Sequence, residues 1–337
     1  MDITEAISFE IKESSQVGEA RREILKFAHN LGFNVANEAR LGLVCAELST
    51  NLLKHTPHGG QLIIQGLSDG HRVGIELYSM DSGNGMNVAD CLEDGFSSSG
   101  TMGTGLGAVK RNTDNFNIYA QFQKGSVVET RIWNESEKHH PETNFGVLNI
   151  PKPGELVSGD KVCFIETDEH VICLLVDGLG HGIEASDASN LAVRRFKENI
   201  DKPPAVALKA IHTSLRGSRG AVGAVARIDK KNMRVFFCGM GNIAAIVTSS
   251  FERKHLTSLN GTLGYEARRF MEFTVPWTKE SLLVMHSDGL SSKTFEDLTS
   301  IEKQPACIIA GWLFQHYSRG NDDSTILVYK QSQHKTN

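Results

Sequence analysis

The sequence predicts a two-domain α/β (α+β) protein, with a helix-covered sheet first and a helix-flanked β-sandwich second. The chain has 337 residues, which is more than one hydrophobic core usually organises. Helical and strand patterns alternate as far as residue 134, where the polar stretch NESEKHHPETN interrupts them. Strand-length apolar runs dominate from Phe145 onward. We therefore place one domain at 1–134, a linker at 135–145 and a second domain at 146–331.

The composition is that of a protein able to bury a core in each half. Hydrophobic residues make up 40% of the chain and charged residues 22%, as in soluble globular proteins. The net charge is −5, with an isoelectric point near 6.2. No block of Lys and Arg forms the basic stripe that binding to a phosphate backbone requires. We expect no nucleic acid partner.

Targeting and redox signals point to the cytoplasm by elimination. The acidic residues Asp2, Glu5 and Glu10 lie where a signal peptide needs a basic start and an apolar run. No apolar stretch approaches the roughly 18 residues of a membrane span, so we expect no membrane partner. The six cysteines are widely spaced without a C-x-x-C pair, which indicates reduced and mostly buried thiols.

The first half has an α/β pattern. We expect a strand at Ile7–Ile11, two helices, of which the second covers about Asn37–His55, and a further helix after Gly107. The turn QKGS contains a glycine that can adopt positive φ. The remaining strands are expected at Gln61–Gly66, Val73–Tyr78, Phe116–Phe122 and Val127–Trp133.

The second half is strand-rich, with two helices expected at Asp187–Asn199 and Ala205–Leu215. Several of its apolar runs are hydrophobic on both faces, which suits a sheet covered by another sheet on one side and by helices on the other. The expected strands are 171–176, 221–228, 233–240, 244–248, 281–286 and 324–329.

The helix Asn37–His55 carries a polar file beside its apolar stripe. Glu47, Asn51 and His55 are four residues apart and share one flank of the helix. An ordinary solvated face would produce the same file. The motifs downstream favour a nucleotide site instead.

Two glycine clusters follow the polar file. Asp81 follows the strand VGIELY, and an aspartate there can accept a hydrogen bond from an adenine amino group while nearby glycines let the backbone approach the ring. The cluster GTGLG at 103–107 opens a helix and can wrap phosphates. The amide of Asn51 offers Mg²⁺ an oxygen without adding charge.

Three stretches, AELSTNLLKH, MDSGNGM and GTGLGAVKR, resemble the N, G1 and G2 boxes of the GHKL ATP-binding superfamily. The segment EDGFSSSGTMGTGLGAVKRNTDNF is similar to the lid of RsbT-type switch kinases, which phosphorylate a serine or threonine of STAS-domain antagonists. The resemblance implies a Bergerat α/β sandwich, ATP and Mg²⁺, with Glu47 as catalytic base, Asn51 as Mg²⁺ ligand and Asp81 as adenine reader. It also implies that the nucleotide is lined by Gly83, Gly85, Gly103, Gly105 and Gly107.

A sensor histidine kinase is the nearest competing class. That class needs a phosphoacceptor histidine on a helical hairpin upstream of the ATP-binding domain. About 36 residues precede the Asn37 helix, and His29 among them has neither an acidic neighbour nor a following proline. We interpret His29 as a solvated helix residue.

In the second half, Asp177, Asp288 and Asp322 all lie at the termini of apolar strands. A single such aspartate is commonly a turn or cap residue. Three converging carboxylates would repel one another strongly, so hard divalent cations such as Mg²⁺ or Mn²⁺ are the expected compensation. Asp160 is a possible fourth acid, and Gly178 can turn its carbonyl toward a metal. Two ions can orient and deprotonate a water for attack on a phosphate ester without a covalent enzyme intermediate.

The motifs SGD, DGLGHG, GAVGAVARID, GMGNI, SDGL and NDDSTILVY occur in an order that resembles the SpoIIE and RsbX branch of the metal-dependent (PPM-type) protein phosphatases. The resemblance implies an α-β-β-α sandwich and two Mn²⁺ or Mg²⁺ ions. By position it implies Asp160, Asp177, Gly178, Asp288 and Asp322 as metal ligands, with Asp177 and Asp288 catalytic. Asp323 could share or replace the role of Asp322. The arginine that grips phosphate in many larger relatives has no clear counterpart here.

Together these features predict a bifunctional regulator of bacterial partner switching. The first domain would phosphorylate, and the second dephosphorylate, a serine or threonine of a STAS-domain anti-sigma antagonist-type protein. The alternative is a phosphatase whose ATP-binding half is only a nucleotide-sensing or docking module. The retained acid Glu47 argues against that alternative, and a scaffold with two dead sites would have lost acids or glycines.

Overall fold

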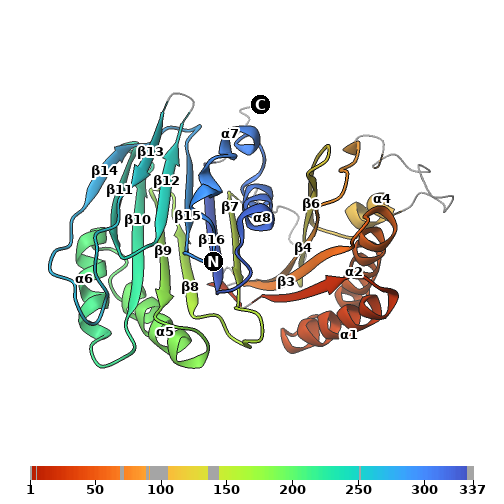
Figure 1. Ribbon diagram of the computed structural model, residues 1–337, viewed down its shortest axis with the longest axis horizontal. Coiled ribbons are helices and arrows are strands. Elements are labelled where there is room, and N and C mark those ends of the chain that lie inside the picture. The colour runs from red at the N-terminus through yellow and green to blue at the C-terminus, as the bar shows by residue number, and fades with distance from the viewer. Residues whose placement is uncertain are drawn as a thin grey trace. The chain divides into compact units, whose positions relative to one another are not determined.

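The computed structural model describes residues 2–4, 6–68, 72–88, 91, 105–135, 144–249 and 252–331 (Figure 1). Two compact units divide between residues 141 and 142, inside the polar stretch that the sequence singles out. The first unit is 2–141 and the second is 142–337. Gly103 and most of the expected linker lie outside the described residues.

The first unit contains an antiparallel sheet in the order β1-β3-β4-β6-β5, with β2 also paired to β3. Strands β3, β4 and β6 are longer than the sequence pattern indicates, because residues such as Ser68, Asp81 and Ser126 also join the ladders, whereas β2 has the expected bounds. Glycine adopts positive φ at the QKGS turn as expected, with φ of 97° at Gly125. The bounds are β1 Asp2–Ile3, β2 Ile7–Ile11, β3 Gly60–Ser68, β4 Val73–Asp81, β5 Asn115–Gln121 and β6 Gly125–Trp133.

Helices α1 (Ser14–Asn30) and α2 (Val35–His55) lie side by side on one face of this sheet (Figure 1). The short helix α4 (Gly105–Arg111) adds Val109 to the same core. Helix α2 begins two residues before the expected Asn37, because the Asn34 side chain caps it by accepting from the Asn37 amide at 2.9 Å. The buried stripe Leu41, Val44, Leu48 and Leu52 is confirmed.

Two glycines of the first unit provide a matched stability test. A β-carbon at Gly60 would lie 2.4 Å from the Met80 carbonyl oxygen and 2.6 Å from a Leu52 methyl, whereas at Gly18 in α1 the nearest atom is 3.5 Å away. We expect Gly60→Ala to destabilise this unit by about 1–3 kcal/mol through overpacking. Gly18→Ala should stabilise it by about 1 kcal/mol through helix propensity. Calorimetric unfolding of both variants checks the opposite signs, and a Gly60→Ala transition at or above the wild-type temperature would contradict the packing.

The second unit is a sandwich of two five-stranded antiparallel sheets, ordered β14-β11-β10-β9-β8 and β13-β12-β15-β16-β7. Phe164 of the first sheet packs against Phe145 of the second with ring centroids 4.8 Å apart, so aromatic side chains fill the interior. The bounds are β7 Phe145–Ile150, β8 Asp160–Glu166, β9 His170–Gly178, β10 Ala221–Asp229, β11 Arg234–Met240, β12 Ala244–Thr248, β13 Arg253–Leu256, β14 Phe273–Pro276, β15 Leu282–His286 and β16 Ser324–Lys330.

Helices cover both outer faces of the sandwich. Helices α5 (Ile183–Lys197) and α6 (Pro204–Ser214) pack on the β8–β11 sheet around a shared core, and α8 (Ala306–Tyr317) packs on β7 and β16. The arrangement is therefore α-β-β-α (Figure 1). The sequence pattern missed α8, because residues 306–314 are all buried and such a segment has no amphipathic period. The short elements η1 Ser292–Phe295 and α7 Leu298–Ile301 were also missed.

Two further expectations can be compared with the described residues. None of the described helices is both long and apolar enough to cross a membrane. The six cysteines are present as thiols rather than disulfides, and five of them are buried. The thiol expectation is confirmed.

Candidate functional sites

Five aspartates of the second unit lie at strand ends that belong to both of its sheets. Asp160 and Asp177 face each other in the ladder between β8 and β9, and Asp177 lies within β9 rather than after it. Asp288 follows β15, and Asp322 and Asp323 precede β16, the neighbouring strand of the other sheet. Antiparallel pairing thus brings these strand ends together.

The electrostatics of Asp177 show that these carboxylates lie close to one another. Burial, together with the charges of Asp160, Asp288, Asp322 and Asp323, raises the pKa of Asp177 to about 9. Burial and the charge of Asp322 also raise the pKa of Asp288. Neighbouring charges shift a pKa only over short distances. We call these five side chains the acid cluster.

Asp160 is the deepest member of the acid cluster. It is 1% exposed, and burial raises its pKa to about 7 even though the hydrogen bond from Ser287 lowers it. The Ser287 hydroxyl donates to Oδ2 of Asp160 at 2.6 Å. Asp160 therefore links the two sheets beneath the other acids.

Asp322 and Asp323 have different surroundings, and the difference bears on which of the two could bind a metal ion. Both Asp323 oxygens accept backbone amides, from Lys152 at 2.8 Å and from Gly159 at 2.9 Å. The carboxylate of Asp322 accepts only the Asp323 amide at 3.0 Å among the hydrogen bonds found in the described chain, and Asp322 is the more exposed of the two residues. This arrangement favours Asp322 as the ligand and gives Asp323 the task of holding the loop.

Glycines allow the chain to approach the acid cluster closely. A β-carbon at Gly178 would lie 2.2 Å from the Ala185 carbonyl oxygen, and one at Gly289 would lie 1.9 Å from that of Asp323. The Gly178 amide donates to the Gly159 carbonyl at 3.1 Å. Gly178 is thus required for packing of α5, a role that is independent of any metal contact.

Several residues around the acid cluster were missed from the sequence. Asn242 donates to Oδ2 of Asp288 at 2.7 Å, and the positive charge of Arg319 lowers the pKa of that aspartate. Ser287 and Gly289 belong to the SDGL motif. This motif could have indicated these two, and the GMGNI motif contains Asn242, whereas only the folded sheets bring Arg319 to Asp288.

The acid cluster fits hard divalent cations. Within the described ranges no group of three or more His, Cys, Asp or Glu side chains is placed to hold a metal ion by itself, but Mg²⁺ commonly binds through one or two carboxylates while keeping several waters. Five buried or half-buried carboxylates with Arg319 as a neighbouring cation leave negative charge to be compensated. Asp177, Asp288 and Asp322 are the residues that would hold such ions, above Asp160.

In the first unit, α2 and α4 bring together Glu47, the expected base, Asn51, the expected Mg²⁺ ligand, and Gly105. A β-carbon at Gly105 would lie 3.5 Å from Oδ1 of Asn51 and 3.6 Å from Oε2 of Glu47. Both side chains are half-buried, whereas His55, on the same flank of α2, is exposed. Any side chain at Gly105 would occupy the space beside Glu47 and Asn51. Gly107 lies within α4 and is half-buried.

Asp81 is the last residue of β4 and is only 7% exposed. Its Oδ1 accepts the Gly83 amide at 2.8 Å, and its Oδ2 accepts the Ser126 hydroxyl. Gly85 has a φ of 72°, and a β-carbon there would lie 2.5 Å from the Gln121 carbonyl. The glycines after Asp81 therefore shape the turn that fixes this carboxylate.

Ser126 was missed from the sequence, and Gly125 was expected only as a turn residue. A β-carbon at Gly125 would lie 1.8 Å from the Asp81 carbonyl oxygen, so the β5–β6 turn abuts the end of β4. Nothing in the local sequence connects residues 45 positions apart. Only the pairing of β4 with β6, in which Asp81 faces Ser126, reveals this contact.

Comparison with known proteins agrees with this geometry. The family model described as stage II sporulation protein E (SpoIIE) matches residues 167–330, a range that includes Asp177, Asp288 and Asp322. The chain carries a SpoIIE-family phosphatase domain. Phosphoserine phosphatase RsbX of Bacillus subtilis (strain 168) is 27% identical over 157 residues, which is 46% of this chain and 77% of RsbX.

The fold of the SpoIIE-family domain is that of a PPM phosphatase. A crystal structure of RsbX in complex with magnesium covers 59% of this chain and 98% of its own, with a TM-score of 0.51 and 21% identity. The expected PPM-type sandwich is thereby confirmed.

A second relative is serine/threonine-protein kinase RsbT of Bacillus subtilis (strain 168). It is 32% identical over 107 residues, which is 32% of this chain and 80% of RsbT. Over that stretch the chain belongs to the family of RsbT.

Proposed function

We propose that this chain is a bifunctional regulator of partner switching, a kinase in its first unit and a metal-dependent serine/threonine phosphatase in its second. The observation that carries the proposal is the acid cluster, in which burial and mutual repulsion raise the pKa of Asp177 to about 9. A fold does not ordinarily gather five carboxylates at one end of a sandwich without a cation to compensate them. The relatives named phosphoserine phosphatase and serine/threonine kinase support the two activities.

In the phosphatase half, the carboxylates of the acid cluster would hold divalent cations, and their neighbours would orient these carboxylates. Asp177, Asp288 and Asp322 would hold two Mn²⁺ or Mg²⁺ ions, with the Gly178 carbonyl as a further ligand. When bound, the ions would supply positive charge for the phosphate and would lower the pKa of a water, so that the water can lose a proton and attack the phosphate. Asp160, bound to Ser287 at 2.6 Å, stabilises the floor of the site, and Asn242 orients Asp288 at 2.7 Å.

In the kinase half, the chain positions a base beside a phosphate site. Phosphoryl transfer depends mainly on positioning and charge neutralisation, so one carboxylate near the incoming hydroxyl is sufficient. Glu47 would accept the proton of the substrate hydroxyl, Asn51 would hold Mg²⁺, and Asp81 would accept the adenine amino group. The closeness of Gly105 to both Glu47 and Asn51 supports this assignment.

The proposed substrate is a serine or threonine of a STAS-domain antagonist-type protein, as the resemblance to switch kinases implies. A single partner acted on by both halves would have its phosphorylated fraction set by the ratio of the two rates.

A time course separates the bifunctional proposal from a docking role of the first unit. Purified protein is incubated with a STAS-domain protein, Mn²⁺ and ATP labelled on the γ-phosphate. We expect labelled STAS protein to appear and then to decay as inorganic phosphate accumulates. A docking module would give no label while still dephosphorylating a STAS protein that was phosphorylated beforehand. Absence of both reactions on several STAS-domain proteins would contradict the proposed function.

A further inference from the structure

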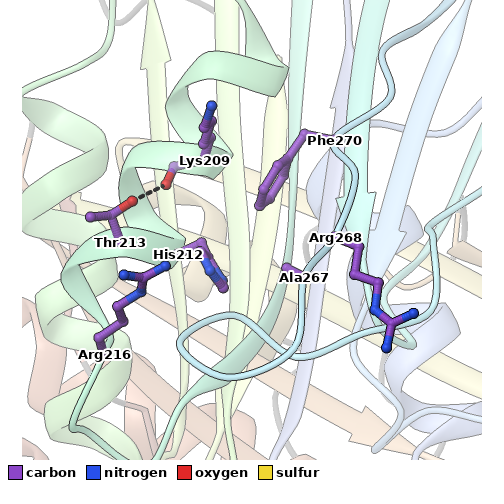
Figure 2. A pocket seen from close by; sticks show the side chains of 7 residues that line it. All are labelled: Lys209, His212, Thr213, Arg216, Ala267, Arg268 and Phe270. Carbon is purple, nitrogen blue, oxygen red and sulfur yellow. Dashed lines mark hydrogen bonds between the residues drawn. The ribbon is translucent and has the colours of Figure 1, made fainter.

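A polar cavity lies on the outer side of the SpoIIE-family domain, between α6 and the segment that precedes β14 (Figure 2). Its volume is about 330 Å³, enough for a phosphate with part of the group that carries it. None of the acid cluster lines it. We call it the α6 pocket, and its lining residues are Lys209, His212, Thr213, Arg216, Ala267, Arg268 and Phe270.

The α6 pocket is strongly cationic. Lys209, His212 and Arg216 lie three or four residues apart, on one face of α6 and its C-terminal extension, and Arg268 comes from the opposite wall. No carboxylate lines the pocket. Among the described ion pairs none involves Lys209 or Arg216. Arg268 contacts Glu266 at 3.1 Å, but both side chains are mostly exposed, so this pair holds Arg268 only weakly.

His212 adds an oriented hydrogen-bond donor to the pocket. The Gly264 amide donates to its Nδ1 at 3.1 Å, so the proton of the neutral ring lies on Nε2. Burial and the charge of Arg216 lower the pKa of His212, which keeps the ring neutral. Phe270 packs edge-on against the His212 ring, with the two ring centroids 5.7 Å apart. It gives the pocket an apolar wall beside the hydrogen-bond donors. Figure 2 shows His212 between Arg216 and Phe270.

The dipole of α6 does not explain this set of cations. A cation just after the C-terminus of a helix is favourable, which would account for Arg216 alone. Lys209 lies in the middle of α6, and Arg268 belongs to a different segment. Cations from two segments around one cavity, with no lining carboxylate, match the recognition of a phosphate group.

We propose that the α6 pocket binds a phosphate group, carried by a phosphorylated side chain or by a small phosphorylated molecule, at a site separate from the acid cluster. Arg216 and His212, which lie side by side in Figure 2, hold the phosphate, and the exposed side chains of Lys209 and Arg268, which extend away from His212 in that view, turn toward the phosphate on binding. The proposal does not depend on either proposed catalytic activity, because it concerns binding alone.

Isothermal titration of the full chain tests the proposal, with EDTA present so that the acid cluster holds no metal and repels anions. The probes are inorganic phosphate, O-phosphoserine and ribose 5-phosphate. We expect Arg216→Gln to weaken binding of each probe about tenfold, the effect of losing one charge-assisted hydrogen bond, and Arg216→Gln with Arg268→Gln to abolish it. The exposed residues Arg234 and Lys279 provide the controls Arg234→Gln and Lys279→Gln, which should bind as wild type.

The three probes distinguish the sources of the phosphate. Tightest binding of O-phosphoserine would support a phosphorylated side chain as the occupant, and tightest binding of ribose 5-phosphate would support a small molecule. The proposal is overturned if wild type binds none of the probes at millimolar concentration, or if the double variant binds them as wild type does. All of these variants replace surface residues, so unchanged thermal unfolding should accompany them.

Discussion

Asp177→Asn is expected to lower the rate of phosphate release from a phosphorylated partner by about a thousandfold, which corresponds to about 4 kcal/mol of transition-state stabilisation. Asparagine has the shape of aspartate but lacks the charge that would hold a divalent ion. At neutral pH and without metal, folding must protonate the Asp177 carboxyl, because burial and the neighbouring acids raise its pKa to about 9, and asparagine removes that free-energy cost. Without metal, Asp177→Asn should therefore unfold at a higher temperature than wild type. Loss of activity together with a gain in stability separates a metal-ligand role from simple misfolding.

Asp187→Asn is the matched control for this experiment. Asp187 is an exposed residue of α5, on the helix that packs beside Gly178, and its replacement should leave phosphate release unchanged. Binding of Mn²⁺, measured by titration calorimetry, should weaken strongly in Asp177→Asn and remain unchanged in Asp187→Asn. If Asp177→Asn binds Mn²⁺ and releases phosphate as wild type does, the acid cluster is not the phosphatase centre.

Glu47→Gln is expected to slow phosphorylation of the partner by a factor of about 10² to 10⁴, the usual contribution of a positioned general base. Glutamine keeps the shape of the side chain beside Gly105, so ATP should still bind. Protein phosphorylation is followed with labelled ATP, and ATP binding is followed separately by titration. The proposed function requires the two readouts to diverge.

Glu38→Gln is the control on the same helix. Glu38 lies in the first turn of α2, where it contacts His29 at 3.2 Å, and it has no part in the proposed site. Phosphorylation should proceed in this variant as in wild type. Equal rates for Glu47→Gln and wild type would exclude Glu47 as the base, and the first unit would then be a docking or nucleotide-sensing module.

Much of the fold was predictable because the amphipathic elements carry their periodicity in the chain. The stripe of α2 and most runs of the sandwich were correctly located, with bounds differing by a few residues. Helix α8 was missed because a segment buried on all sides has no polar face to set a period. The short strands β13 and β14 were missed because few of their side chains are buried.

Local sequence by itself determined which residues are chemically equipped for function: acids at strand ends, an acid and an amide one helical turn apart, and glycines where the backbone must turn. Only the tertiary structure decided how these groups meet. The ladder that sets Asp160 opposite Asp177, the Ser126 hydroxyl on Asp81, and the amides that occupy Asp323 rather than Asp322 all join residues distant in the chain. The α6 pocket is a further case, because Arg216 and Arg268 line the same cavity only after α6 has packed on the sheet. Such contacts depend on which strands pair and on how the helices pack, and these join residues that lie far apart in the sequence.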